Sequence, residues 1–226
     1  MQIDVWSDIV CPWCAIGKKR LEAALLQFDH ADQVQVVWHS FELDQTPAAE
    51  RPPVGSITEL LAKKYGMSLA QAQAANERVV TQAAAEGMTW DIEKVKPSAT
   101  FDAHRLLQFA GQGSLQAKLM DRLMTAYFAE GQLLSDPAVL HKLAGEVGLD
   151  ATEAAEILAS DRFAAEVRAD EKFAAHNGIT GVPFFILGGR YGVSGAQPAA
   201  ALAQALATAW KDPLTHRQAD SPIRPA

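Results

Sequence analysis

Segments with the composition of β-strands occur only near the two ends of this sequence. They are rich in β-branched and aromatic residues or alternate polar with apolar side chains, and from residue 47 to residue 182 such patterns are almost absent. The four candidate strands are residues 2–6, 33–41, 183–187 and 190–194. Gly188-Gly189 is typical of a tight hairpin turn between the last two. We therefore expect one sheet built from both ends of the chain.

The middle of the sequence has the periodicity of helices and contains signals for their ends. Ser56 with Glu59 and Ser68 with Gln71 match the capping box, and an Asp-Pro pair at 136–137 is typical of a helix start. Glycines that would end helices are Gly87, Gly111, Gly131, Gly148 and Gly178. The predicted helices are 12–28, 57–65, 69–86, 99–110, 115–130, 137–147, 153–159, 161–177 and 198–210.

The order of these elements predicts an α/β protein with a mixed sheet and a large all-helical insertion. The first two strands flank one helix, so they form a βαβ unit and should be parallel. We expect one discontinuous domain from 1–46 and 161–213, a helical insertion domain at 47–160, and a disordered tail at 214–226, which is rich in polar residues and proline.

Composition and charge exclude several classes of partner. The net charge of −7 argues against binding to nucleic acid or to an anionic membrane surface, and no apolar run is long enough to span a bilayer. The first residues lack a basic start, a long apolar stretch and a cleavage site, so they do not match a secretory signal. We expect a cytoplasmic protein, in which paired thiols usually perform chemistry or bind metal.

The only two cysteines, Cys11 and Cys14, lie three positions apart where the first strand gives way to the first helix. Free amides and the helix dipole favour an anion at that point, so we expect Cys11 to be a reachable thiolate and Cys14 to stay shielded and protonated. Disulfide exchange needs this asymmetry. Pro12 is tolerated in the first helical turn, and Trp13 offers a flat apolar surface beside the nucleophile.

Two other interpretations of the cysteine pair stay open at this point. The pair would make half of a zinc site, although the sequence has no second Cys-x-x-Cys and no paired-histidine motif, so we predict no metal. Alternatively, both cysteines are inert core residues, since free cysteine is often buried. The spacing and the strand-to-helix position favour redox chemistry over either alternative.

Five segments together carry a family resemblance. In the expected order they are 7–17 (SDIVCPWCAIG), 38–43 (WHSFEL), 100–106 (TFDAHRL), 178–183 (GITGVP) and 194–197 (SGAQ). With these segments the chain resembles the FrnE-like branch of the DsbA family, which is related to the glutathione-dependent 2-hydroxychromene-2-carboxylate isomerases and the kappa-class glutathione transferases. The resemblance implies a thioredoxin-like fold and a thiol–disulfide oxidoreductase.

The resemblance also implies roles for residues outside the cysteine pair. It implies that the Val182-Pro183 bond is cis, that this loop faces the cysteines, and that the backbone of Val182 pairs with bound substrate in the manner of a strand. It places His104 toward a substrate-binding cleft, although a lone histidine on a helix is more often a structural hydrogen-bonding group.

The same resemblance places Ser194, Gly195 and Gln197 at the start of the last helix. Free amides there would hold a carboxylate such as that of glutathione, and an ordinary capped helix start is the alternative. We therefore expect no bound cofactor, with glutathione as a candidate co-substrate. Relatives also suggest a homodimer.

Three functions are compatible with the sequence. The favoured one is disulfide exchange with protein thiols or small thiols. The second is a glutathione-dependent isomerase or transferase, in which a serine generally stands at the position of Cys11. The third is a non-catalytic holdase or docking protein whose cysteine pair is vestigial or regulatory, and its activity would survive Cys11→Ser.

Overall fold

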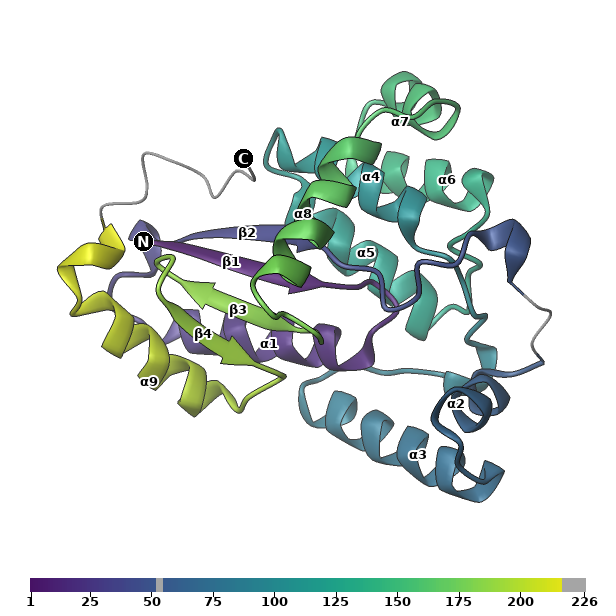
Figure 1. Cartoon of the computed structure of the whole chain (residues 1–226), viewed down its shortest axis with the longest axis horizontal. Helices are drawn as coiled ribbons and strands as arrows, with labels where there is room; N and C mark the ends of the chain where they lie inside the picture. The colour runs from purple at the N-terminus through teal and green to yellow at the C-terminus, as the bar shows by residue number, and fades with distance from the viewer. Residues whose placement is uncertain (52–54, 217–226) are drawn as a thin grey trace. The chain divides into compact units, whose positions relative to one another are not determined.

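In a computed structural model, which describes residues 1–51 and 55–216, the two ends of the chain form one four-stranded sheet (Figure 1). The strands are β1 (Gln2–Ser7), β2 (Gln35–Ser40), β3 (Phe184–Leu187) and β4 (Tyr191–Ser194). They lie in the order β2-β1-β3-β4. β1 pairs in parallel with β2 and antiparallel with β3, which pairs antiparallel with β4. The predicted mixed sheet and its parallel βαβ unit are confirmed.

The helices follow the predicted order. They are α1 (Pro12–Leu26), α2 (Ile57–Tyr65), α3 (Leu69–Ala85), α4 (Phe101–Gly111), α5 (Gln116–Phe128), α6 (Pro137–Val147), α7 (Ala151–Leu158), α8 (Ala164–His176) and α9 (Ala199–Trp210). Short 3₁₀ helices span Ala31–Gln33, Ala48–Glu50, Ile92–Lys94 and Pro213–His216. None of the described helices is long and apolar enough to cross a membrane.

The chain divides into two compact units. The sheet unit consists of Met1–Leu43 together with the chain from Ala164 onward, and the helical unit is Asp44–Phe163. The sequence had suggested boundaries at 46/47 and 160/161. Both cysteines and all four strands belong to the sheet unit, so the candidate chemistry and the sheet lie together.

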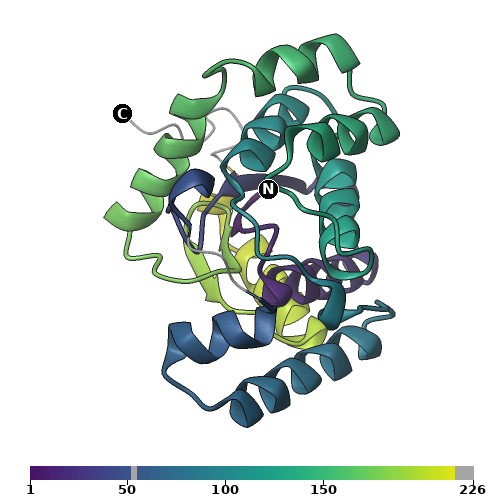
Figure 2. The ribbon, with the colours of Figure 1, turned by 90° about the vertical axis from the view of Figure 1, so that its right-hand side faces the viewer.

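Helices cover both faces of the sheet. α8 lies over one face, and α1 with α9 lies over the other (Figures 1 and 2). Side chains alternate between the faces along each strand. Trp6 of β1 is fully buried on the α8 face, where its ring stacks on Phe173 with centroids 5.0 Å apart and packs with Ala174 and Ile179. Ile3 and Val5 therefore point to the α1 face, where both are fully buried.

A buried polar network joins β1, β2 and α8. The His39 ring lies between two carboxylates, with Nδ1 2.8 Å from Asp170 Oδ1 and Nε2 2.9 Å from Asp4 Oδ1. Asp170 also accepts the backbone amide of Ser40 at 2.7 Å, and its backbone carbonyl accepts Trp6 Nε1 at 3.1 Å. Burial lowers the pKa of His39, but the hydrogen bonds and charges of Asp170 and Asp4 outweigh it and raise the pKa to about 9. The imidazole is therefore a cation that links the sheet to α8 at neutral pH.

The helical unit is organised mainly by contacts between helices that follow one another in sequence, such as α2 with α3 and α6 with α7 (Figure 2). Both predicted capping boxes are confirmed: Ser56 accepts the amide of Glu59, and Ser68 accepts that of Gln71, each with the reciprocal bond. Asp136 likewise caps α6. These local bonds satisfy amides that a helix start leaves free, so α2, α3 and α6 begin where the sequence predicts.

One arginine joins distant parts of the helical unit. Arg105 of α4 is buried, and its Nη1 donates to the carbonyls of Ile157 at 2.7 Å, Ser160, and Arg162 at 3.1 Å. Its Nε and Nη2 also donate to Asp102. The guanidinium thus joins α4 to the last turn of α7 and to the segment that follows it.

Several predicted boundaries were wrong. α8 begins at Ala164 and not at 161, because Phe163 has φ of 64°, a left-handed conformation that no helix continues through. α1 ends at Leu26, two residues before the predicted end at 28. Gly111 is the last residue of α4 and, unlike the other four glycines named above, is not in the left-handed region.

The predicted tail is only partly described. Residues 214–216 belong to the 3₁₀ helix Pro213–His216, so the prediction of disorder is wrong for them, and 217–226 lie outside the described residues. The Thr215 hydroxyl holds these residues in place, because it is buried and donates to the carbonyl of Ala209 at 2.8 Å.

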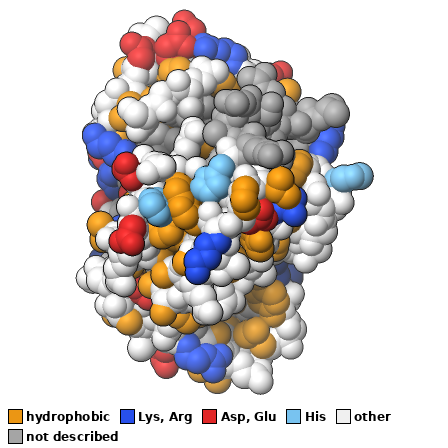
Figure 3. Space-filling model, turned by 90° about the vertical axis from the view of Figure 1, so that its left-hand side faces the viewer, with side chains coloured by type: hydrophobic (Ala, Val, Ile, Leu, Met, Phe, Trp, Pro, Cys, Tyr) orange, Lys and Arg blue, Asp and Glu red, His pale blue; other side chains and the backbone are white. Residues whose placement is uncertain are grey.

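On the face drawn in Figure 3, acidic and basic side chains are dispersed among hydrophobic ones.

Candidate active site

Cys11 is the residue at which helix α1 begins. It is the N-cap, with extended φ and ψ of −87° and 113°, and Pro12 occupies the first turn. The Cys11 carbonyl accepts the amides of Cys14 at 3.1 Å and Ala15 at 3.3 Å, which closes the first turn around the cysteine pair. The Cys-Pro-x-Cys sequence thus places one sulfur at the helix tip and the other one turn inside.

The Cys11 sulfur is less accessible than the sequence suggested. Only 4% of the residue is exposed, whereas the neighbouring Trp13 is 41% exposed. The reason is the loop before β3: Cys11 Sγ lies 3.6 Å from the carbonyl oxygen of Val182 and donates to it, and the Val182-Pro183 peptide bond is cis. Both cysteines are free thiols. Residues 171 positions apart thus meet at one sulfur.

Cys14 is fully buried, as the sequence predicted. Its pKa is raised well above the ordinary value, first by burial and then by the hydrogen bond and charge of Cys11. The Ser7 hydroxyl and the Asp8 backbone amide lower the pKa, but less. Cys14 is therefore a protonated thiol at neutral pH, which is the state expected of a thiol that reacts only in the second step of disulfide exchange.

Gly17 brings α1 close to the cis-proline loop, a role that the sequence-based predictions missed. A Cβ at this position would lie 2.8 Å from Cγ of Pro183 and 3.4 Å from Cζ of Phe185. Any other side chain would push the loop away from the cysteines. A glycine inside an otherwise regular helix was the available signal, because it weakens the helix and often marks a close approach.

The segment before α9 is also fixed to this loop. The Gly195 amide donates to the carbonyl of Pro183 at 2.8 Å, and the carbonyl of Ala196 accepts Arg20 of α1 at 2.6 Å. The Gln197 amide donates to Gly195, and its side chain donates to the carbonyl of Ser194. Two of the amides expected to hold a carboxylate therefore already have acceptors.

Two further residues of the family motifs, His104 and Asp8, are buried. His104 is buried on α4 of the helical unit, and its role in substrate binding stays a prediction. Asp8 is buried beside the cysteines, where its Oδ2 accepts the amide of Leu43 at 2.8 Å. This bond fixes the chain that leaves β2 to the turn before Cys11. Among the described residues, no group of three or more His, Cys, Asp or Glu is placed to hold a metal.

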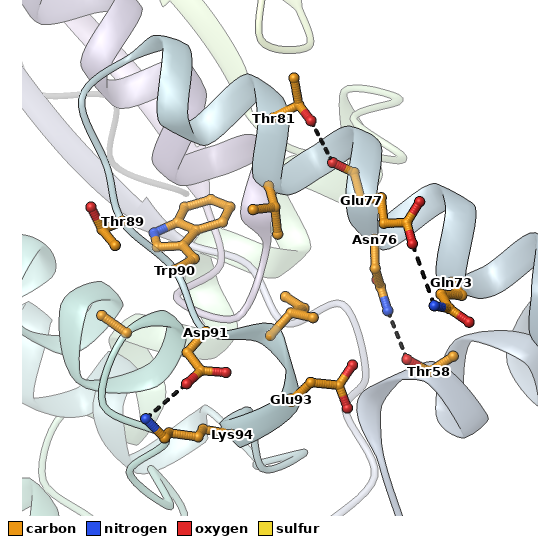
Figure 4. Close-up of a pocket in the computed structure, with 13 residues that line it drawn as sticks. Thr58, Gln73, Asn76, Glu77, Thr81, Thr89, Trp90, Asp91, Glu93 and Lys94 are labelled. Carbon is orange, nitrogen blue, oxygen red and sulfur yellow. Dashed lines mark hydrogen bonds and ion pairs between the residues drawn. The ribbon is translucent and has the colours of Figure 1, made fainter.

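A cavity of about 850 Å³ lies within the helical unit (Figure 4). α3 forms one wall and residues 89–94 form another, with the Trp90 ring between them. Several of its polar groups bond to one another: Asn76 Nδ2 donates to Thr58 at 2.9 Å, and Lys94 pairs with Asp91 at 2.7 Å. Neither cysteine lines it, so the cysteine pair and its loop remain the candidate site.

Comparison with known proteins agrees with this geometry. The model of the DSBA-like thioredoxin domain family matches residues 2–207. The chain belongs to this family. The DsbA-like fold accounts for the mixed sheet, the helical insertion and the cysteine pair at the start of α1.

Individual relatives span nearly the same length. The crystal structure of the probable DsbA oxidoreductase SCO1869 from Streptomyces coelicolor is 46% identical and has a TM-score of 0.88, with 94% of this chain and 91% of that chain covered. The uncharacterized protein YwbO of Bacillus subtilis strain 168 is 32% identical over 83% of this chain and 87% of its own length. A 2-hydroxychromene-2-carboxylate isomerase, 18% identical with a TM-score of 0.66 over 98% and 100% of the two chains, shares the fold.

Proposed function

We propose that this DsbA-like protein exchanges disulfides with protein thiols or small thiols of the cytoplasm, with Cys11 as nucleophile and Cys14 as resolving thiol. The observation that carries the proposal is the pairing of two unlike sulfurs. One stands at a helix tip against the Val182 carbonyl, and the other is fully buried with a raised pKa. An equally exposed pair would lack this division of roles.

The reaction proceeds in two steps when a substrate disulfide is reduced. The Cys11 thiolate attacks one substrate sulfur, forms a mixed disulfide and releases the other substrate sulfur as a thiolate. Cys14 then loses its proton and attacks Cys11, which forms the Cys11–Cys14 disulfide and releases the second substrate thiolate. The substrate gains two electrons and two protons, and an external thiol such as glutathione returns the protein to its reduced form. Oxidation of a substrate dithiol is the same sequence in reverse.

The low exposure of Cys11 sets a condition on this mechanism. A substrate sulfur reaches Cys11 only if it displaces the contact with Val182, and the carbonyl and amide of that loop are then free to pair with substrate backbone. The exposed Trp13 ring gives the substrate an apolar surface next to the sulfur.

Insulin reduction and refolding of a scrambled disulfide protein test the proposal, with wild type, Cys11→Ser and Cys14→Ser. Cys11→Ser should fall to the rate of the uncatalysed reaction. Cys14→Ser should react once and accumulate a mixed disulfide that mass spectrometry detects. Full disulfide-exchange activity of Cys11→Ser would contradict the proposal. Wild type without exchange activity, but with a protection of unfolded protein from aggregation that survives Cys11→Ser, would favour a holdase, and isomerase or transferase turnover that needs glutathione but not Cys14 would favour the glutathione-dependent alternative.

A further inference from the structure

The hydroxyl of Ser7 has an unusual environment. Ser7 is the last residue of β1 and is fully buried, and among the described side chains its oxygen is a buried polar atom without a hydrogen-bond partner of normal geometry. A buried hydroxyl without a partner is destabilising, so natural proteins rarely keep one without a reason.

The alternation of β1 fixes the direction of this side chain. Trp6 packs against α8, so its neighbour Ser7 points to the opposite face, toward α1. Val5 lies on the same face as Ser7 and pairs with Phe185, whose ring approaches Gly17 of α1. Ser7 therefore lies under the first turns of α1, where the second cysteine is buried.

The Cys14 sulfur is the group that would use this hydroxyl. Burial and Cys11 raise the pKa of Cys14, while the Ser7 hydroxyl and the Asp8 backbone amide act in the opposite direction. Both groups donate hydrogen bonds, and a donor favours the charged form of an acceptor. The thiol form of Cys14 gives the hydroxyl only a weak acceptor, whereas a thiolate would give it a strong one.

We propose that Ser7 donates a hydrogen bond to the Cys14 sulfur whenever that sulfur carries negative charge, and thereby assists resolution of the mixed disulfide. The inference rests on the proposed function. In that step Cys14 gives its proton to solvent, the Cys14–Cys11 bond forms, the bond from Cys11 to the substrate sulfur breaks, and the departing thiolate takes a proton from solvent. Ser7 keeps its own proton throughout. In the reverse direction, Ser7 stabilises Cys14 as the leaving group.

Stopped-flow reaction of the reduced protein with 5,5′-dithiobis(2-nitrobenzoate) separates the two steps. Attack by Cys11 releases one thionitrobenzoate, and resolution by Cys14 releases the second. Ser7→Ala should leave the first release unchanged and move the pH–rate curve of the second to higher pH. At neutral pH the second release should slow about threefold, because a roughly tenfold loss of thiolate is partly offset by the greater nucleophilicity of a more basic sulfur.

Ser40→Ala is the matched control. Ser40 is buried, is the register partner of Ser7 on β2, and has no part in the proposed mechanism. It should leave both releases and their pH dependence unchanged.

Stability separates this role from a structural one. Ser7→Ala removes an unpaired buried hydroxyl, so the reduced variant should resist urea at least as well as wild type. Reduced stability or loss of folding would show that the hydroxyl supports the fold and would overturn the inference, as would an unchanged second release. If wild type itself released no first thionitrobenzoate, Cys11 would not be the nucleophile. That result would overturn the proposed function, and the assignment of Ser7 with it.

Discussion

The sheet unit and the helical unit differ in the sequence distance over which their polar contacts act. In the sheet unit, Cys11 meets Val182 across 171 residues and Trp6 meets Asp170 across 164. In the helical unit, many polar contacts cap a helix within three residues, as Ser56 does with Glu59. Arg105 is an exception, since its carbonyl acceptors lie more than fifty residues away.

This difference shows why the candidate chemistry resides in the sheet unit. Two sulfurs in a short helical turn require only local structure, but a nucleophile held against a distant backbone carbonyl requires strands brought together from both ends of the chain. The helical unit places many of its side chains with interactions that a short segment already contains. Substitutions at long-range contacts should therefore destabilise the protein more than substitutions at local contacts, and should affect more of the chain.

The largest expected effect is at Arg105, which makes long-range contacts within the helical unit. Arg105→Met should lower the free energy of unfolding by about 3–5 kcal/mol, because three carbonyls lose a charged donor in a buried place. Hydrogen exchange should become faster in α4 and α7 and stay unchanged in β1. Arg162→Met is the control: Arg162 pairs with Glu153 and Glu156 on the surface and should contribute about 1 kcal/mol or less. Equal losses for the two variants would contradict the comparison.

The second largest effect is expected in the sheet unit, whose stability should depend on pH because His39 titrates. Its pKa is raised from 6.5 to about 9 in the folded protein, so its stabilisation is fully present below pH 6.5 and is lost as the pH rises through 9. The loss should be about 3 kcal/mol. Urea unfolding at a series of pH values, compared with His39→Gln, measures it. An imidazole that titrates near 6.5 by NMR would refute the bridge between Asp4 and Asp170.

The smallest effect is at the local contacts of the helical unit. Ser56→Ala removes the side-chain half of the α2 capping box and should cost about 1 kcal/mol. Hydrogen exchange should report it in the first turn of α2 only. Ser68→Ala makes the same change at α3 and should behave alike. A change in the reactivity of Cys11 in either variant would show that these caps act beyond their own helices.

Prediction from the sequence succeeded where the determining interactions are local. The bounds of α2 and α6 were predicted correctly, because the residues that cap their starts and the glycine that ends α6 lie next to the helices in the sequence. It failed at the start of α8, where an aromatic residue, Phe163, takes a left-handed conformation that its residue type disfavours.

The candidate site divides in the same way. The positions of Cys11 and Cys14 at the start of α1 were predicted from spacing and context, and the cis bond before Pro183 only from family resemblance. The roles of Gly17 and Ser7 were missed. Gly17 of α1 meets Pro183 and the β3 residue Phe185, and Ser7 of β1 faces α1, so both depend on how the strands and α1 pack, which a single sequence does not contain.

The sequence by itself determined the helices, the strands and the asymmetric position of the two cysteines, because hydrophobic periodicity and capping act within a few residues. The tertiary structure decided that Cys11 lies against Val182, that only 4% of it is exposed, and that Ser7 points toward α1. These facts follow from the order β2-β1-β3-β4, in which β1 brings the first residues of the chain beside a strand close to its other end. Contacts of that kind depend on how the whole sheet closes, and no short segment specifies them.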